Sequence, residues 1–129
     1  MKPEEIFNKI ISREIPAHII WESDKPLAFL DINPIQPGHT LLVPKRGIDY
    51  VFDMNDQDYT DLWLAAKEVA KILKDKLKAK RIAVAVEGFA VPHAHIHLVP
   101  VNHGNELNPE LAKKATEEEL LAISHEIVS

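Results

Sequence analysis

The segment between Pro92 and Pro100 constrains the fold of this chain more than any other. Its sequence, His-Ala-His-Ile-His-Leu-Val, leaves seven residues between two prolines, which is short for a helix and typical of a strand. Side chains alternate between the two faces of a strand, so His93, His95 and His97 are expected to share one face. The apolar residues between them would pack on the other face. The segment therefore predicts a strand with one imidazole face and one apolar face.

Apolar periodicity and turn residues outline the remaining elements. In the first half of the chain, we expect a short amphipathic helix over residues 3–12 and strands over 18–21, 27–32 and 39–43. A long helix follows, capped by Asn55 and reaching Leu77. After it we expect a buried strand over 81–86, the histidine strand, and a C-terminal helix that begins with a capping box at Thr116 to Glu119. Short turns join the first three strands, which favours an antiparallel meander.

Length and composition limit the class of protein. With 129 residues, 46% of them hydrophobic, residues 1–129 are expected to form a single domain, with the motifs in 1–100 and a C-terminal loop and helix in 101–129. A net charge of -5 argues against a nucleic-acid polymer as partner, because binding its phosphates requires Lys and Arg. The chain lacks cysteine and shows no signal-peptide or membrane-span pattern, so a cytoplasmic location is expected.

Three interpretations fit three histidines on one strand face. The first is a solvated polar face, although Thr, Lys or Glu would provide solubility without titrating near neutral pH. The second is a zinc site; because His93 and His97 lie about 13 Å apart along a strand, it needs His39, Asp31 or water as further ligands. The third is nucleophilic catalysis, in which the central imidazole attacks while its neighbours orient it, stabilise charge or donate protons.

The pattern HxHxHxx from Val91 to Val99, with apolar residues between the histidines, resembles the signature of the histidine-triad (HIT) family. Further segments resemble landmarks of that family in the same order along the chain: Ile6-Phe7, Glu14 to Ala17, Ala28 to Pro34, and Pro37 to Lys45. The resemblance extends from Ile6 to Pro100.

The resemblance implies an α+β fold of the HIT-like type: a five-stranded antiparallel sheet with a long helix and short N- and C-terminal helices, assembled as a two-fold homodimer. It implies that His95 attacks the α-phosphate of a nucleotide and becomes a nucleotidyl-histidine, with His93, His97 and His39 around the transferring group. Asp31 would accept hydrogen bonds from the ribose hydroxyls. The apolar residues expected to frame the purine base are Ile6, Phe7, Ile15, Phe29, Leu30 and Ile32.

The implied reaction is cleavage of a nucleoside phosphoramidate or a dinucleoside polyphosphate, with no cofactor required. Many family members carry an amide and a hydroxyl side chain just before the triad, whereas this chain has the apolar loop Gly88 to Val91. Side-chain contacts to phosphate are therefore missing there, which bears on the rate. Two alternatives stay open: a nucleotide-binding regulatory protein with little or no turnover, and a zinc-binding protein.

Overall fold

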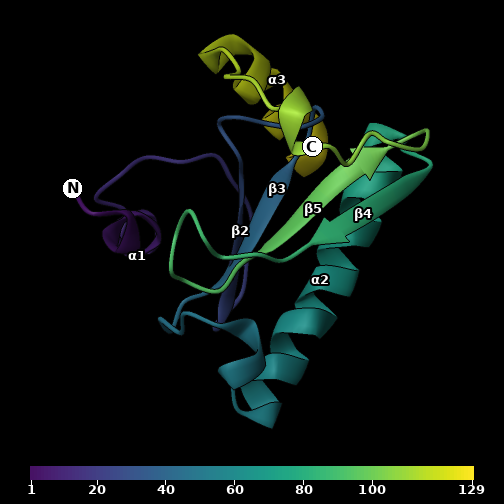
Figure 1. Cartoon of the computed structure of the whole chain (residues 1–129). Coiled ribbons are helices and arrows are strands. Elements are labelled where there is room, and N and C mark those ends of the chain that lie inside the picture. The colour runs from purple at the N-terminus through teal and green to yellow at the C-terminus, as the bar shows by residue number, and fades with distance from the viewer.

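The computed structural model describes residues 1–129 and contains one five-stranded sheet, in which the order of the strands is β1-β2-β3-β5-β4 (Figure 1). The strands are β1 (Ile19–Glu22), β2 (Pro26–Leu30), β3 (Thr40–Pro44), β4 (Arg81–Ala85) and β5 (Ile96–Val101). Every pair of neighbouring strands is antiparallel. The predicted meander of the first three strands is confirmed, as is the five-stranded antiparallel sheet that the family resemblance implies.

Three α-helices pack against the sheet, and each is preceded by a short 3-10 turn. The helices are α1 (Ile6–Ile11), α2 (Asp56–Leu77) and α3 (Glu117–Val128); the turns are η1 (Pro3–Glu5), η2 (Val51–Asp53) and η3 (Pro109–Leu111). Asn55 caps α2 by accepting a hydrogen bond from the N–H of Asp58, and Thr116 and Glu119 form the capping box of α3. The predicted starts of both helices are confirmed. None of the helices combines the length and the apolar character needed to cross a lipid bilayer.

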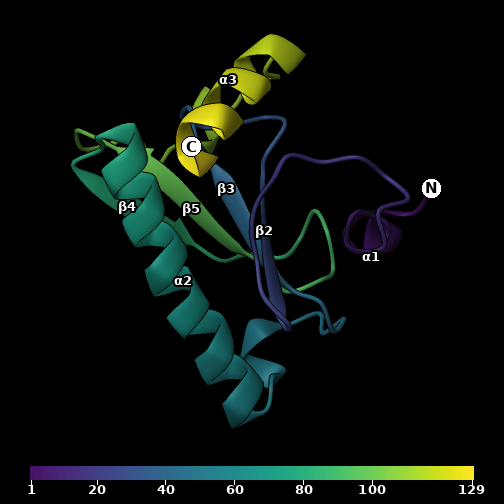
Figure 2. The same ribbon diagram turned by 180° about the vertical axis from the view of Figure 1, so that it is seen from behind.

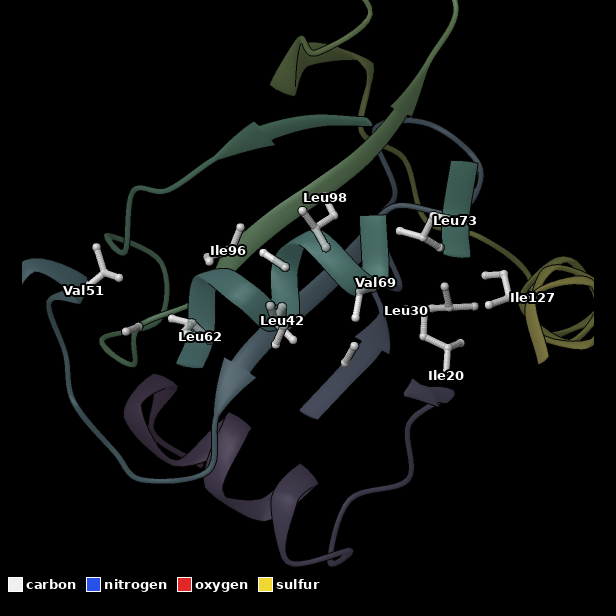
Figure 3. Close-up of a cluster of buried hydrophobic side chains, with 14 of the residues drawn as sticks. Ile20, Leu30, Leu42, Val51, Leu62, Val69, Leu73, Ile96, Leu98 and Ile127 are labelled. Atoms are coloured by element: carbon white, nitrogen blue, oxygen red, sulfur yellow. The ribbon is translucent and has the colours of Figure 1, made fainter. Parts of the chain in front are cut away.

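The sheet buries apolar side chains on both faces. On one face, α2 and α3 pack against residues that include Leu30, Leu42 and Leu98 (Figure 3). The helix α2 lies behind β4 and β5 in Figure 1 and in front of them in Figure 2. On the other face, α1 contributes to a smaller cluster made of Phe7, Ile10, Leu27, Phe29, Leu41 and Val43. The helix α1 is therefore the one that borders the face opposite α2.

The histidine strand begins later than predicted. β5 starts at Ile96, so His97 lies within it, whereas His93 and His95 precede it. The N–H of Ala94 is bound instead by the carbonyl of Ile48, in the loop that follows β3, at 2.6 Å. That bond satisfies the backbone outside the sheet, and the expectation of three histidines on one strand is wrong for this reason.

The end of the strand and the burial of its neighbour also differ from the prediction. Pro100 lies inside β5. It comes after Leu98, the last residue that pairs with β3, so its missing N–H costs no hydrogen bond between β3 and β5.

The strand β4 is less buried than the sequence predicts. It pairs only with β5 and forms an edge of the sheet, where Val84 is 43% exposed. A short apolar run is compatible with either a central or an edge strand.

Gly38 fixes the turn that places His39 at the start of β3. Its φ is +90°, a region that L residues rarely adopt. A Cβ atom at this position would also collide with the side chain of Leu77 and lie 3.1 Å from Cγ of Pro100. Backbone conformation and close packing both require glycine here.

We expect Gly38→Ala to lower the free energy of unfolding by about 1–3 kcal/mol, because a non-glycine residue is strained at this φ. Urea unfolding followed by tryptophan fluorescence measures the change. Gly104→Ala is the matched control, since a Cβ atom there meets nothing within 4 Å. Equal stability of the two variants would contradict the role assigned to Gly38.

Candidate active site

The adjacent ends of β2 and β3 bring Asp31 and His39 together. Leu30 lies opposite Thr40 in the register, and the next pair outward is joined by a 2.9 Å hydrogen bond from the Asp31 N–H to the His39 carbonyl. Residues directly opposite each other in antiparallel strands project from the same face. Accordingly, Asp31 Oδ2 lies 3.6 Å from His39 Nε2.

His97 reaches the same point from β5. It lies opposite Leu41 in the register, so His39, two residues before Leu41 on the same face, approaches it on the diagonal. His39 Nε2 is 2.9 Å from His97 Nδ1, and the ring centroids are 5.1 Å apart. The register of the sheet thus builds a pair of imidazoles from residues 58 positions apart in sequence.

The two histidines before β5 are held by main-chain carbonyls. His95 Nδ1 lies 2.6 Å from the carbonyl oxygen of His93, and His93 Nε2 lies 2.8 Å from that of Pro44 at the end of β3. The ring centroid of His95 is 4.9 Å from that of His97. Although the backbone leaves the sheet ladder here, both side chains are fixed, and His95 stands next to His97.

Phe7 of α1 packs against this row of imidazoles. Its ring centroid is 5.0 Å from that of His95 and 5.6 Å from that of His93, with interplanar angles of 84° and 74°. Such edge-to-face packing is favourable between aromatic rings. Phe7 also contacts Phe29 of β2 edge to face, with ring centroids 5.6 Å apart. The helix α1 therefore walls the site with an aromatic ring.

The hydrogen-bond partners determine which ring nitrogens carry protons. His39 Nδ1 lies 3.0 Å from the backbone nitrogen of Ile35, which donates its N–H, so Nδ1 is an acceptor. Neutral His39 then carries its proton on Nε2 and donates it to Nδ1 of His97. Neutral His97 in turn carries its proton on Nε2. This tautomer assignment follows from the network of donors and acceptors.

The same reasoning applies to the other two histidines. The carbonyl of His93 accepts a hydrogen bond, so His95 Nδ1 is a donor, and neutral His95 keeps a lone pair on Nε2. Likewise, His93 Nε2 donates to the Pro44 carbonyl. A free lone pair on His95 therefore stands beside a ring, His97, whose Nε2 carries an N–H.

Burial favours the neutral forms of His39, His93 and His97. His39, His93 and His95 are three of only four buried polar residues in the chain. Desolvation lowers the pKa of His39, against an opposing effect of the Asp31 carboxylate, and it lowers the pKa of His93. Burial, together with the neighbouring His95 and His39, lowers the pKa of His97 from 6.5 to about 4. At neutral pH, His39, His93 and His97 are therefore uncharged.

Asp31, His39 and His97 also offer ligand atoms within 4.8 Å of one another, a set able to hold a divalent cation. Coordination would need a lone pair on His39 Nε2, which means moving its proton to Nδ1. There the proton would face the N–H of Ile35, donor against donor. The hydrogen-bond pattern therefore opposes zinc at these three residues.

The residues expected to contact the nucleoside divide between the two faces of the sheet. Asp31 lies at the histidine cluster, where Oδ1 also accepts the N–H of Asn33. Phe7 and Phe29 belong to the apolar cluster on that face, with Ile6 and Ile15 packed against it, while Ile32 is 55% exposed. Leu30 does not join them, because its side chain packs into the core on the α2 face.

The loop from Gly88 to Val91 supplies no polar side chain to the site. Phe89 is 93% exposed, and Gly88 has a φ of +96° with open space around it. The only recorded bond of this loop to the histidines is the one from the His93 N–H to the Val91 carbonyl. Any contact with phosphate here would be made by backbone N–H groups.

Three backbone groups that shape the site could not be identified from the sequence. They are the N–H of Ile35 and the carbonyls of Pro44 and Ile48. Every residue except proline has both groups, so no residue type indicates which of them will be used. The one available signal is the turn Pro34 to Gly38, where two prolines and a glycine restrict the backbone.

Comparison with known proteins identifies similar chains. A model of the HIT domain matches residues 12–104. An uncharacterized HIT-like protein of Methanocaldococcus jannaschii is 38% identical over 104 residues, which cover 78% of this chain and 81% of that protein. The bis(5'-adenosyl)-triphosphatase of Dictyostelium discoideum is 30% identical over 89 residues, which cover 65% of this chain and 60% of that protein.

A solved structure agrees with the fold over nearly the whole chain. The Hit-like protein involved in cell-cycle regulation from Bartonella henselae, solved with an unknown ligand, has a TM-score of 0.85 and 32% sequence identity. The match covers 98% of this chain and 96% of that one. The strands and helices that hold the four histidines are thus shared with a known structure.

We expect the free energy of unfolding to fall as the pH drops from 6.5 toward 4. In that range the unfolded chain protonates His97 while the folded chain keeps it neutral, so acid favours unfolding. Between pH 7 and 5, His97 alone contributes about 1–2 kcal/mol of this loss. The carboxylates whose pKa values are lowered by their partners add to the loss of stability mainly at lower pH, where carboxylates themselves become protonated.

Urea unfolding at several pH values measures this dependence. His97→Gln should flatten it between pH 7 and 5, whereas the control His125→Gln, at an exposed position on α3, should leave it unchanged. An equally steep dependence in His97→Gln would show that other groups control acid stability.

Proposed function

This chain belongs to the HIT domain family, and from that premise we propose that it is a nucleotidyl hydrolase or transferase with His95 as its nucleophile. The proposed substrates are nucleoside phosphoramidates and dinucleoside polyphosphates, cleaved at the α-phosphate. The observation that carries the proposal is the lone pair on His95 Nε2, left free because Nδ1 donates to the His93 carbonyl 2.6 Å away. Neutral imidazole with a fixed tautomer is a competent nucleophile near pH 7.

In the first step, His95 Nε2 attacks the α-phosphorus; the N–P bond forms while the bond from phosphorus to the leaving group breaks. The proton stays on Nδ1, and its hydrogen bond to the His93 carbonyl stabilises the positive charge of the ring. The leaving amine or nucleotide takes a proton from solvent. In the second step, water attacks phosphorus and loses a proton to solvent, the N–P bond breaks, and the nucleoside monophosphate is released.

The His39–His97 pair assists as a hydrogen-bond donor. His97 Nε2–H is available to a phosphoryl oxygen, where negative charge develops. The pair is unsuited to delivering a proton, because an extra proton on His97 Nδ1 would face the Nε2–H of His39 at 2.9 Å. The pair therefore stabilises charge without changing its own protonation.

The nucleoside would lie between Asp31 and α1. The carboxylate of Asp31 has one oxygen, Oδ1, engaged with a backbone N–H, and the side chain is 19% exposed, so it can still accept a ribose hydroxyl. Apolar side chains from α1 and β2 on the same face suit a purine base. The name of the Dictyostelium relative, an adenosyl-triphosphatase, supports an adenine nucleotide among the substrates.

The apolar loop Gly88 to Val91 supports a second candidate function, a nucleotide-binding regulatory protein with slow turnover. A lost transition-state donor costs orders of magnitude in rate while leaving nucleotide affinity largely intact.

A cytoplasmic location, expected from composition, is proposed for either function.

We expect wild-type protein to release nucleoside monophosphate from adenosine or guanosine phosphoramidate or from diadenosine polyphosphates, and His95→Ala to lose at least about 1000-fold in kcat. Intact-protein mass spectrometry of quenched reactions should find a nucleotidyl adduct in the wild type only. His125→Ala is the control, since that exposed side chain lies outside the cluster.

An adduct that persists in His95→Ala would eliminate this residue as the nucleophile. Tight nucleotide binding by a wild-type protein without turnover would support the regulatory function instead.

We further propose that two copies of the chain form a homodimer through the free edge of β4. An edge strand presents unpaired backbone groups, and here it carries Val84, which is 43% exposed. This free edge suits a second copy that pairs with β4 and continues the sheet.

Val84→Lys is expected to shift the protein from dimer to monomer, because a lysine on an edge strand opposes pairing with a second strand. Size-exclusion chromatography with light scattering gives the mass in solution. Leu64→Lys, which changes a 60% exposed leucine of α2, serves as the control. A monomeric wild type, or a dimer unaffected by Val84→Lys, would refute this interface.

A further inference from the structure

The backbone N–H of Ile35 determines the orientation of protons across the histidine cluster. It donates to His39 Nδ1 at 3.0 Å, which leaves the His39 proton on Nε2, facing His97. If Ile35 moved away, both tautomers of His39 would be possible. In the Nδ1–H form, His39 Nε2 would be an acceptor, so His97 would carry its proton on Nδ1 and donate it to His39. The position of one loop amide therefore decides which nitrogen of His97 carries the N–H.

The loop that holds Ile35 is not closely packed against the C-terminal part of the chain. A cavity of about 330 Å³ lies between the residues 34–39 and the C-terminal part of the chain. Apolar side chains from that part, including Leu111 and Ile123, line its other side. Across this space, hydrogen bonds connect the loop to the C-terminal part of the chain.

Three hydrogen bonds connect this loop to the C-terminal segment. Two are made by backbone groups: Lys113 N–H donates to the Pro34 carbonyl at 3.4 Å, and Ala115 N–H donates to the Ile32 carbonyl at 2.9 Å. The third comes from a side chain: Gln36 Nε2 donates to the Glu106 carbonyl at 3.2 Å. These bonds attach the loop to a segment that lies beyond the histidine motif.

Gln36 has the most direct connection to the cluster. It follows Ile35 in the chain, and its own carbonyl accepts the N–H of His39 at 3.0 Å. The acceptor of its side chain, Glu106, is itself anchored, because its carboxylate accepts the N–H groups of Asn102 and His103. One side chain thus spans 70 residues and joins the turn before β3 to the turn after β5.

We propose that Gln36 is a positioning residue: by tethering the loop to Glu106, it holds the Ile35 amide against His39 Nδ1 and so keeps His97 Nε2–H directed toward the substrate phosphate. The positioning of the proton stands on the geometry alone. Its effect on turnover rests on the proposed function.

The tautomer is measured first in the wild-type protein, by nitrogen-15 NMR. We expect His39 as the Nε2–H tautomer, with a scalar coupling through the hydrogen bond between the Ile35 amide nitrogen and His39 Nδ1. A protonated Nδ1 on His39 would overturn the proposal before any variant is made.

Gln36→Met keeps the length of the side chain and removes its donor. We expect mixed tautomers of His39, loss of the coupling to Ile35, and a kcat about fivefold lower, the factor corresponding to one ordinary hydrogen bond, with unchanged KM. Gln57→Met is the matched control, because the exposed Gln57 donates to Asp61 within α2, away from the cluster. The control should keep the wild-type tautomer and kcat.

The two measurements separate this proposal from the proposed function. If the wild type has no turnover, the proposed enzyme activity fails, while the NMR comparison of Gln36→Met with Gln57→Met still decides the positioning role. A single Nε2–H tautomer in a folded Gln36→Met protein would overturn that role. Mixed tautomers with wild-type kcat would overturn its catalytic consequence.

Discussion

A neutral imidazole has one donor nitrogen and one acceptor nitrogen, and this fold supplies partners that allow only one arrangement for its central histidines. The amide of Ile35 requires an acceptor, so the proton of His39 faces His97. The carbonyl of His93 requires a donor from His95 Nδ1, which leaves the lone pair on His95 Nε2 free, and the carbonyl of Pro44 fixes the ring of His93 in the same way. Burial favours the neutral forms of His39 and His97. In addition, a second proton on His97, at Nδ1, would face the Nε2–H of His39. The chemistry of the cluster thus depends on backbone groups from three different segments.

The sequence predicted the fold well where the information is local. Apolar runs bounded by turn residues indicated the strands β2 and β3, and the caps at Asn55 and Thr116 located the starts of α2 and α3. The beginning of β5 depends instead on a distant partner, because Ile48 takes the N–H of Ala94. A hydrogen bond between segments 46 residues apart leaves no periodic trace, so the strand was expected two to three residues too early.

The candidate site shows the same limit at the level of single residues. Motif and resemblance identified the four histidines and Asp31, and the sheet register brings His39, His97 and Asp31 together. Leu30 was assigned to the nucleoside from its place in a landmark segment, yet strand alternation turns it to the α2 face. The turn that carries Ile35 was recognised as a turn, but the atom it presents to His39 depends on how the loop is supported by a segment far along the chain.

The zinc and nucleophile interpretations, both open from the sequence, turn out to require opposite protonation patterns. A metal at Asp31, His39 and His97 needs lone pairs on the two facing nitrogens, 2.9 Å apart. The proposed phosphoryl transfer needs the proton of His39 on Nε2, directed at His97 Nδ1. Only then does His97 carry its own proton on Nε2, where it is a donor beside the free lone pair of His95. The amide of Ile35 selects the second pattern. A single main-chain hydrogen bond therefore favours the protonation pattern that the proposed phosphoryl transfer uses, a preference that the histidine motif alone does not indicate.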